Sequence, residues 1–123
     1  MTEPVSLLPV DLQQGPFILA FDTLAGVQGA VNTYHGFRNK PYEFGRAIAL
    51  MHSELSEALE GDRHNNPPSD HIPEFSAIEE ELADVVLRIM DTADWQKLRL
   101  GEAVIAKLRY NAGRPPMHGG KKY

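Results

Sequence analysis

The chain has 123 residues, of which 42% are hydrophobic and 24% are charged, a composition typical of one soluble globular domain. It contains no cysteine and has a net charge of −5, which excludes a zinc–thiolate site and argues against nucleic acid as a general partner. The sequence shows no bilayer-length apolar run and no secretory leader pattern, so we expect a cytoplasmic protein without membrane contact.

The N-terminal part is expected to begin as an extended segment and to continue as a helix. Residues 1–16 contain prolines and a glycine and lack a helical period, which predicts an extended N-terminal arm. Pro16 suits the first turn of a helix because its φ is fixed, and apolar residues recur after it at three- to four-residue steps. We therefore predict a helix over residues 17–37, which the sequence Asn39-Lys40-Pro41 ends.

Two further helices and a polar loop are predicted for the middle of the chain. An apolar stripe favours a helix over residues 42–61, for which Gly61 is a natural terminator. Residues 62–72 are rich in Asn, Pro and Asp, which is typical of a loop. Pro73 is expected to open the next helix, over residues 74–95.

The last predicted helix spans residues 101–112, and the basic segment 115–123 is expected to be a flexible tail. No alternating strand pattern competes with the helical one. The sequence thus predicts an all-α fold, in which residues 17–114 form a single domain that resembles a four-helix bundle. Helices of this length leave apolar surface uncovered, so we expect a homodimer or a homotetramer.

Four carboxylates in two short spacings stand out in the two central helices. Glu54 and Glu57 lie three residues apart, and after an interval of 23 residues Glu81 and Asp84 repeat that spacing. Side chains three apart share a helix face, so antiparallel packing of the two helices would gather all four at one edge of the interface. Acidic groups at such a seam need a counter-ion, either a metal ion or an arginine such as Arg88.

The ligand types favour Mg²⁺, or Mn²⁺, over other metals. An all-oxygen donor set suits hard divalent ions. Neither carboxylate pair has the histidine that a di-iron Glu-x-x-His site requires, and no His-Glu-x-x-His zinc motif is present. An alternative interpretation is that these helices are simply rich in surface glutamate.

The charge distribution changes sharply towards the C-terminus. Residues 54–94 contain twelve acidic and two basic residues, whereas residues 97–123 contain seven basic residues and one acidic residue. Lys107, Asn111 and Arg114 fall on one helix face and form a candidate phosphate clamp. The alternative is that these cations merely complement the dipole at a helix C-terminus.

The two carboxylate motifs, "LMHSELSEALE" and "EEELADVVLRIMD", resemble the signature of the MazG-like all-α nucleoside triphosphate pyrophosphohydrolases. That superfamily also includes the dimeric dUTPases, the dCTP pyrophosphatases and the phosphoribosyl-ATP pyrophosphohydrolases. The resemblance covers roughly residues 43–114 and extends to the phosphate-contacting lysine and asparagine, which Lys107 and Asn111 match.

The resemblance implies Mg²⁺-dependent hydrolysis of a nucleoside triphosphate between the α and β phosphates, which yields a nucleoside monophosphate and pyrophosphate. It implies Glu54, Glu57, Glu81 and Asp84 as metal ligands, and among them we assign Glu57 as the general base. The aromatic side chains that could stack on a base are more typical of a helical core; they are Tyr34, His35, Phe37 and Trp95. The alternative function is a non-catalytic helical regulatory or interaction module that keeps the fold.

Overall fold

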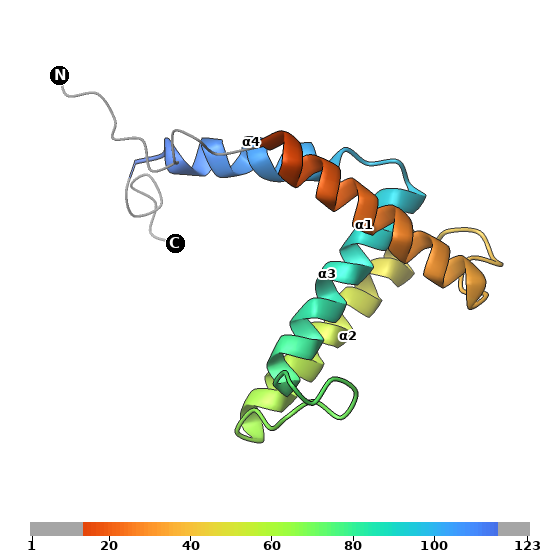
Figure 1. Ribbon diagram of the computed structural model, residues 1–123, viewed down its shortest axis with the longest axis vertical. Coiled ribbons are helices and arrows are strands. Elements are labelled where there is room, and N and C mark those ends of the chain that lie inside the picture. The colour runs from red at the N-terminus through yellow and green to blue at the C-terminus, as the bar shows by residue number, and fades with distance from the viewer. Residues whose placement is uncertain (1–13, 116–123) are drawn as a thin grey trace. The chain divides into compact units, whose positions relative to one another are not determined.

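The computed structural model describes residues 14–115, and within this range every regular element is a helix (Figure 1). The four helices are α1 (Gln14–Tyr34), α2 (Phe44–Arg63), α3 (Ala77–Trp95) and α4 (Leu100–Ala112). The predicted all-α class is confirmed. The predictions for residues 1–13 of the arm and 116–123 of the tail lie outside the described residues.

Helix α1 begins and ends three residues earlier than the sequence predicted. Residues 14–16, which were assigned to the extended arm, are helical. Pro16 is tolerated there because the first four N–H groups of a helix have no acceptor within it. The helix ends at Tyr34 rather than at residue 37, since Gly36 takes a positive φ of 82°, which reverses the chain.

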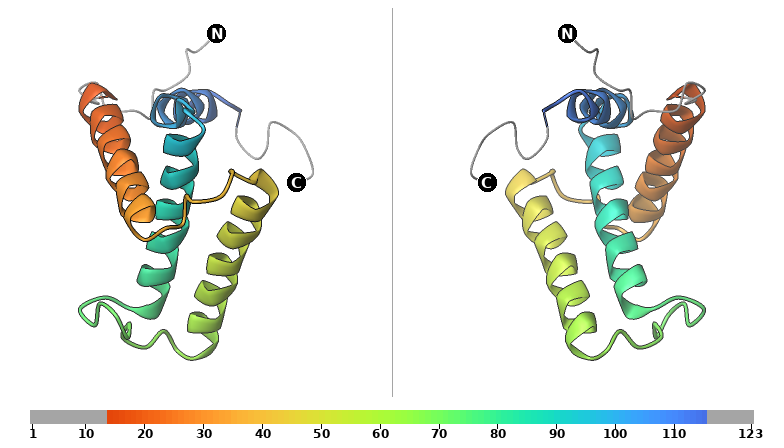
Figure 2. Two further views of the ribbon diagram at one scale, coloured as in Figure 1. Left: turned by 90° about the vertical axis from the view of Figure 1, so that its right-hand side faces the viewer. Right: turned by 90° about the vertical axis from the view of Figure 1, so that its left-hand side faces the viewer.

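The chain divides into two compact units, of which the larger comprises residues 22–98. The other contains, among the described residues, 14–21 and 99–115. In the larger unit, α2 and α3 run antiparallel, side by side, and are joined by the loop that follows Arg63 (Figures 1 and 2). Ala58 of α2 and Met90 of α3 are buried, so the apolar faces of this helix pair form part of the core.

The expectation that Gly61 terminates α2 was wrong, because the helix continues through it to Arg63. A Cβ at position 61 would lie 3.3 Å from the Cβ of Ala77, at the start of α3. Glycine therefore permits a close approach of the two helices. The helix ends where Asn65 and Asn66 take positive φ values of 64° and 50°, which asparagine adopts more readily than most residues.

The predicted start of the third helix at Pro73 was also wrong, because α3 begins at Ala77. Ser76 and Glu79 form a capping box: the Ser76 side chain accepts from the Glu79 N–H, and the Glu79 side chain accepts from the Ser76 N–H. Two backbone donors at the start of the helix are thereby satisfied. Asn66 adds a third contact, since its Oδ1 accepts from the Ile78 N–H at 2.9 Å.

The loop between α2 and α3 is fixed to α3 by a buried serine. Ser69 is only 3% exposed, and its Oγ donates to Glu80 at 2.6 Å. The same Oγ accepts from the backbone N–H groups of His71 and Ile72. These bonds hold the loop against the first turns of α3, which carry Glu79, Glu80 and Glu81.

Helix α4 agrees with its predicted bounds to within one residue, and Gly113 follows it as expected. Gly101 and Ile105 are buried on it. Across residues 14–115, no helix combines the length and the apolar character that crossing a bilayer requires.

Candidate metal centre and adjoining pocket

Three carboxylates converge between α2 and α3. Glu54, Glu81 and Asp84 each place one oxygen within 4.8 Å of the oxygens of the other two. Glu54 comes from α2, while Glu81 and Asp84 lie one turn apart on α3. All three side chains are partly buried, because they flank the stripe through which the antiparallel helices pack. The structure therefore brings together three of the four carboxylates that the sequence singled out.

Glu57, the fourth predicted ligand, lies outside this group. It is exposed on α2, one turn after Glu54. Its assignment as a ligand and as the general base stays a prediction.

Crowding makes the three carboxylates hard to ionise together. Desolvation by burial, followed by a hydrogen bond to Glu54 and Coulomb repulsion by Glu54, raises the pKa of Glu81 to about 7. Burial and the charges of Glu54 and Glu80 likewise raise the pKa of Asp84, against the opposing effect of Arg88. Without a bound cation, the cluster is therefore expected to retain a proton near neutral pH.

Arg88 places a positive charge beside the cluster. The sequence placed this residue one turn past Asp84, and the structure pairs it with the neighbouring helix. Its Nε and Nη2 both donate to Oε1 of Glu54, at 3.1 and 2.9 Å. The predicted arginine counter-ion is therefore present, and Glu54 is its hydrogen-bonded partner.

Neighbouring acids on α3 have other roles. Glu79 completes the capping box, and Glu80 accepts from Ser69 and pairs with His71. Hydrogen bonds from Ser69 and His71 lower the pKa of Glu80, and the bond to Glu80 raises the pKa of His71. Of the three consecutive glutamates, only Glu81 thus faces the cluster.

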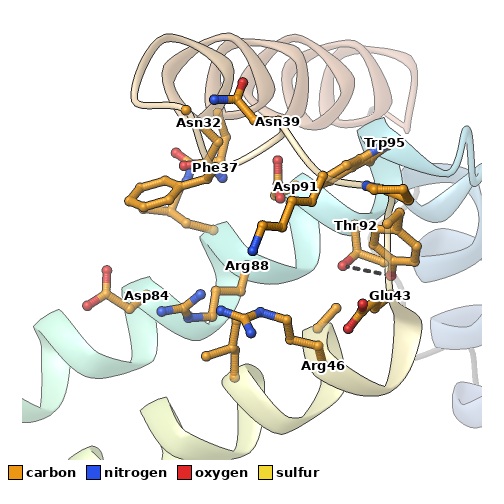
Figure 3. A pocket seen from close by; sticks show the side chains of 18 of the residues that line it. Asn32, Phe37, Asn39, Glu43, Arg46, Asp84, Arg88, Asp91, Thr92 and Trp95 are labelled. Carbon is orange, nitrogen blue, oxygen red and sulfur yellow. Dashed lines mark hydrogen bonds between the residues drawn. The ribbon is translucent and has the colours of Figure 1, made fainter.

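The cluster lies beside a pocket of about 810 Å³, which is formed within the unit of residues 22–98 (Figure 3). Glu54, Asp84 and Arg88 line it together with residues of α1 and of the connection that leads into α2. Arg46 from α2 and Arg88 from α3 extend into the space between the helices, and Asp84 lies at its edge (Figure 3). The pocket thus combines acidic and cationic side chains.

Aromatic and amide side chains complete the lining. Phe37 and Trp95 both contribute, although the sequence analysis favoured a core role for them. Tyr34 and His35 are exposed and are not among the lining residues of this pocket. The lining also includes polar residues that the sequence analysis did not identify: Gln28, Asn32, Asn39, Lys40 and Arg46. No motif marks these residues, because they come from separate elements.

An ion-pair network holds the wall of the pocket that carries Trp95. Arg38 pairs with Asp91 and with Asp94, and its guanidinium lies 4.8 Å from the centroid of the Trp95 ring. Its Nη2 also donates to the backbone carbonyl of Asp91 at 3.3 Å. Tyr42 adds a hydrogen bond to Thr92 and an edge contact with Trp95. Arg38 is therefore held by two ion pairs, a hydrogen bond to a backbone carbonyl and a cation–π contact with Trp95.

The predicted phosphate clamp belongs to the smaller unit. Lys107, Asn111 and Arg114 are all exposed. The Lys107 Nζ lies 4.5 Å and the Arg114 Cζ 5.7 Å from the centroid of the Tyr110 ring. Lys107 and Arg114 thus both make cation–π contacts with the ring of Tyr110.

Metal affinity is expected to rise with pH between 6 and 8. The pKa of Glu81 is raised to about 7, so below that value a metal ion must displace a proton from the cluster. Competition with one proton weakens apparent affinity by about tenfold for each pH unit below 7. Mn²⁺ titration followed by electron paramagnetic resonance, at constant ionic strength, measures this dependence. An affinity that stays constant from pH 6 to 8 would contradict the proton-sharing cluster.

Comparison of the chain with models of known families, with curated proteins and with solved structures finds no match.

Proposed function

We propose that this protein is a Mg²⁺-dependent nucleoside triphosphate pyrophosphohydrolase that releases pyrophosphate and a nucleoside monophosphate. The observation that carries the proposal is the convergence of Glu54, Glu81 and Asp84 at the edge of a pocket that also contains cations and aromatic rings. A nucleoside triphosphate presents the matching chemistry, since it joins a polyanion that binds metal ions to a flat base that stacks.

The three carboxylates fit a hard divalent ion. They offer only oxygen donors, and the raised pKa values of Glu81 and Asp84 reflect repulsion that a cation would relieve. Mg²⁺, or Mn²⁺ in its place, would neutralise charge on the phosphate oxygens and acidify a bound water. Glu54, Glu81 and Asp84 would hold the ion.

The other predicted site residues take the remaining roles. Glu57, which is exposed on α2 one turn after Glu54, remains the proposed base that accepts the proton of the attacking water. Lys107, Asn111 and Arg114 remain the proposed phosphate contacts, on the strength of the family resemblance.

The base is proposed to bind at the other side of the pocket. Phe37 is 71% exposed as a residue, which suits stacking better than core packing. Asn32 and Asn39 lie near it (Figure 3), and their amides can both donate to and accept from a base edge.

Self-association to a MazG-type bundle, as a homodimer or homotetramer, is part of the same proposal. Several aliphatic side chains of α2 and α3 are about half exposed: Leu55, Leu59, Leu82 and Val86. A second copy of the chain would cover such a surface and complete the bundle.

The activity is tested with a panel of canonical and modified nucleoside triphosphates in the presence of Mg²⁺ or Mn²⁺. We expect pyrophosphate, rather than inorganic phosphate, as the product, because cleavage occurs between the α and β phosphates. Activity that survives the combined change Glu57→Ala and Asp84→Ala would reject the proposed site. Absence of turnover on every nucleotide, together with tight binding of a protein partner, would favour the non-catalytic module.

A further inference from the structure

Two partly buried arginines of the larger unit, Arg38 and Arg88, pair with carboxylates, and they differ in how firmly they are held. The side chain of Arg38 is 16% exposed; it pairs with two aspartates, donates to a carbonyl and packs over Trp95. The side chain of Arg88 is 38% exposed. Among the described residues, Glu54 is the one hydrogen-bonded partner of Arg88. Arg38 is therefore locked in place, whereas Arg88 can exchange its partner.

The contact between Arg88 and Glu54 engages one of the three carboxylates of the candidate metal centre. Both acceptor positions of Glu54 Oε1 are taken by N–H groups of Arg88. The Glu54 carboxylate is thus paired with a guanidinium, which supplies positive charge that a metal ion would otherwise supply.

Arg88 has further donors that this contact does not use. A guanidinium carries five N–H groups in a planar fork, and the bonds to Glu54 account for two of them. Arg88 lines the pocket and projects into it beside Asp84 (Figure 3). A planar guanidinium binds phosphate oxygens well, so Arg88 can bind a phosphate group that enters the pocket.

We propose that Arg88 is an exchangeable counter-ion, which neutralises Glu54 in the metal-free protein and binds a phosphate group of the nucleotide once a metal ion occupies the centre. This inference rests on the proposed function. It adds a phosphate-binding residue, Arg88, and an order of binding in which the metal ion precedes the contact between Arg88 and the phosphate. Arg88 then opposes metal binding when no nucleotide is present and favours nucleotide binding when metal is present.

The proposal predicts opposite effects of one substitution on two affinities. In Arg88→Met, Mn²⁺ without nucleotide is expected to bind several-fold more tightly, since the Glu54 carboxylate loses its competing cation. At saturating Mg²⁺, binding of a non-hydrolysable α,β-imido nucleoside triphosphate is expected to weaken by about tenfold or more, the usual effect of losing hydrogen bonds to a charged group. Paramagnetic resonance measures the first affinity, and titration calorimetry measures the second.

Two further variants control for charge and for folding. Arg46→Met removes one positive charge from the same pocket but leaves the Arg88–Glu54 contact intact. It is expected to tighten Mn²⁺ binding less than Arg88→Met does. Arg88→Lys keeps the charge without the planar fork and should show part of both changes. If Arg88→Met does not fold, as judged by circular dichroism, Arg88→Lys carries the test.

The outcomes separate this inference from the proposed function. If the unmodified protein binds neither Mn²⁺ nor any of the analogues, the proposed function and the inference fail together. If it binds both, the inference alone fails in three cases: Arg88→Met weakens both affinities, it changes neither, or Arg46→Met tightens Mn²⁺ binding equally. Weakening of both would indicate a purely structural arginine.

Discussion

Replacing Glu81 by glutamine is expected to stabilise the metal-free protein while it abolishes Mg²⁺-dependent pyrophosphate release. The introduced amide has no charge and can still donate a hydrogen bond to Glu54, as the protonated carboxyl of Glu81 does. Loss of a metal-binding carboxylate is expected to lower turnover by about 10³-fold, because metal ions supply several kcal/mol of charge stabilisation in the transition state. Pyrophosphate release and thermal unfolding by circular dichroism measure the two effects.

The stabilisation of the metal-free protein by Glu81→Gln is expected to depend on pH, which provides a further test. The pKa of Glu81 is raised in the folded protein to about 7, from an ordinary value of 4.5, so the folded state binds the extra proton. Ionised Glu81 therefore destabilises the protein fully above pH 7, and this effect fades as the pH falls towards 4.5. Glu81→Gln should unfold at a higher temperature than the unmodified protein at pH 8 and at nearly the same temperature at pH 4.5.

A suitable control is Glu74→Gln, which removes the same charge from an exposed position in the loop before α3. It should change neither turnover nor the pH dependence of unfolding. Equal loss of activity in both variants would show that overall charge, rather than the cluster, matters. Unchanged activity in Glu81→Gln would remove Glu81 from the metal centre.

Replacing Gly29 by alanine is expected to destabilise the larger unit strongly. A Cβ at this position would overlap the Asp94 carboxylate and would lie 2.6 Å from the Nη2 of Arg38. Both groups belong to the ion-pair network that supports Trp95, and neither can give way without breaking a contact. Overpacking of this kind costs roughly 1–3 kcal/mol in free energy of unfolding. Urea denaturation measures the loss.

The matched control is Gly45→Ala in α2. A Cβ at position 45 meets no atom within 4 Å, so no clash opposes the substitution. Alanine favours the helix over glycine by roughly 0.5–1 kcal/mol, so a small gain in stability is expected. If Gly29→Ala is as stable as Gly45→Ala, the close packing of Asp94 and Arg38 on α1 is not a constraint on the fold.

Local patterns determined the helices well, and the errors lie at their ends. Apolar periodicity located all four helices, because each must bury one face. Pro73 predicts a start of α3 at residue 74, whereas the helix begins at Ala77 behind the capping box of Ser76 and Glu79. Serine followed three residues later by glutamate is the sequence signal for that start. Gly61 resembles a helix terminator because glycine often follows the last residue of a helix. The close approach of Ala77, which favours glycine at this position, arises only once the helices pack.

For the candidate site too, local patterns predicted part of the arrangement and packing decided the rest. Helical spacing and antiparallel pairing were enough to single out four carboxylates, because side chains three residues apart share one helix face. Three of the four, Glu54, Glu81 and Asp84, converge in the structure. Packing decided which carboxylates come together. Glu57 stays exposed outside the group, and Glu54 accepts a hydrogen bond from Arg88.

The sequence by itself thus determined the helical class and the acidic character of the seam, which are properties of short stretches of chain. Only the tertiary structure decided the pocket, because Asn32, Phe37 and Trp95 come from three separate segments. Their proximity depends on how Arg38 ties the segment after α1 to α3 through Asp91 and Asp94. Contacts between residues so far apart in the chain leave no periodic trace in the sequence.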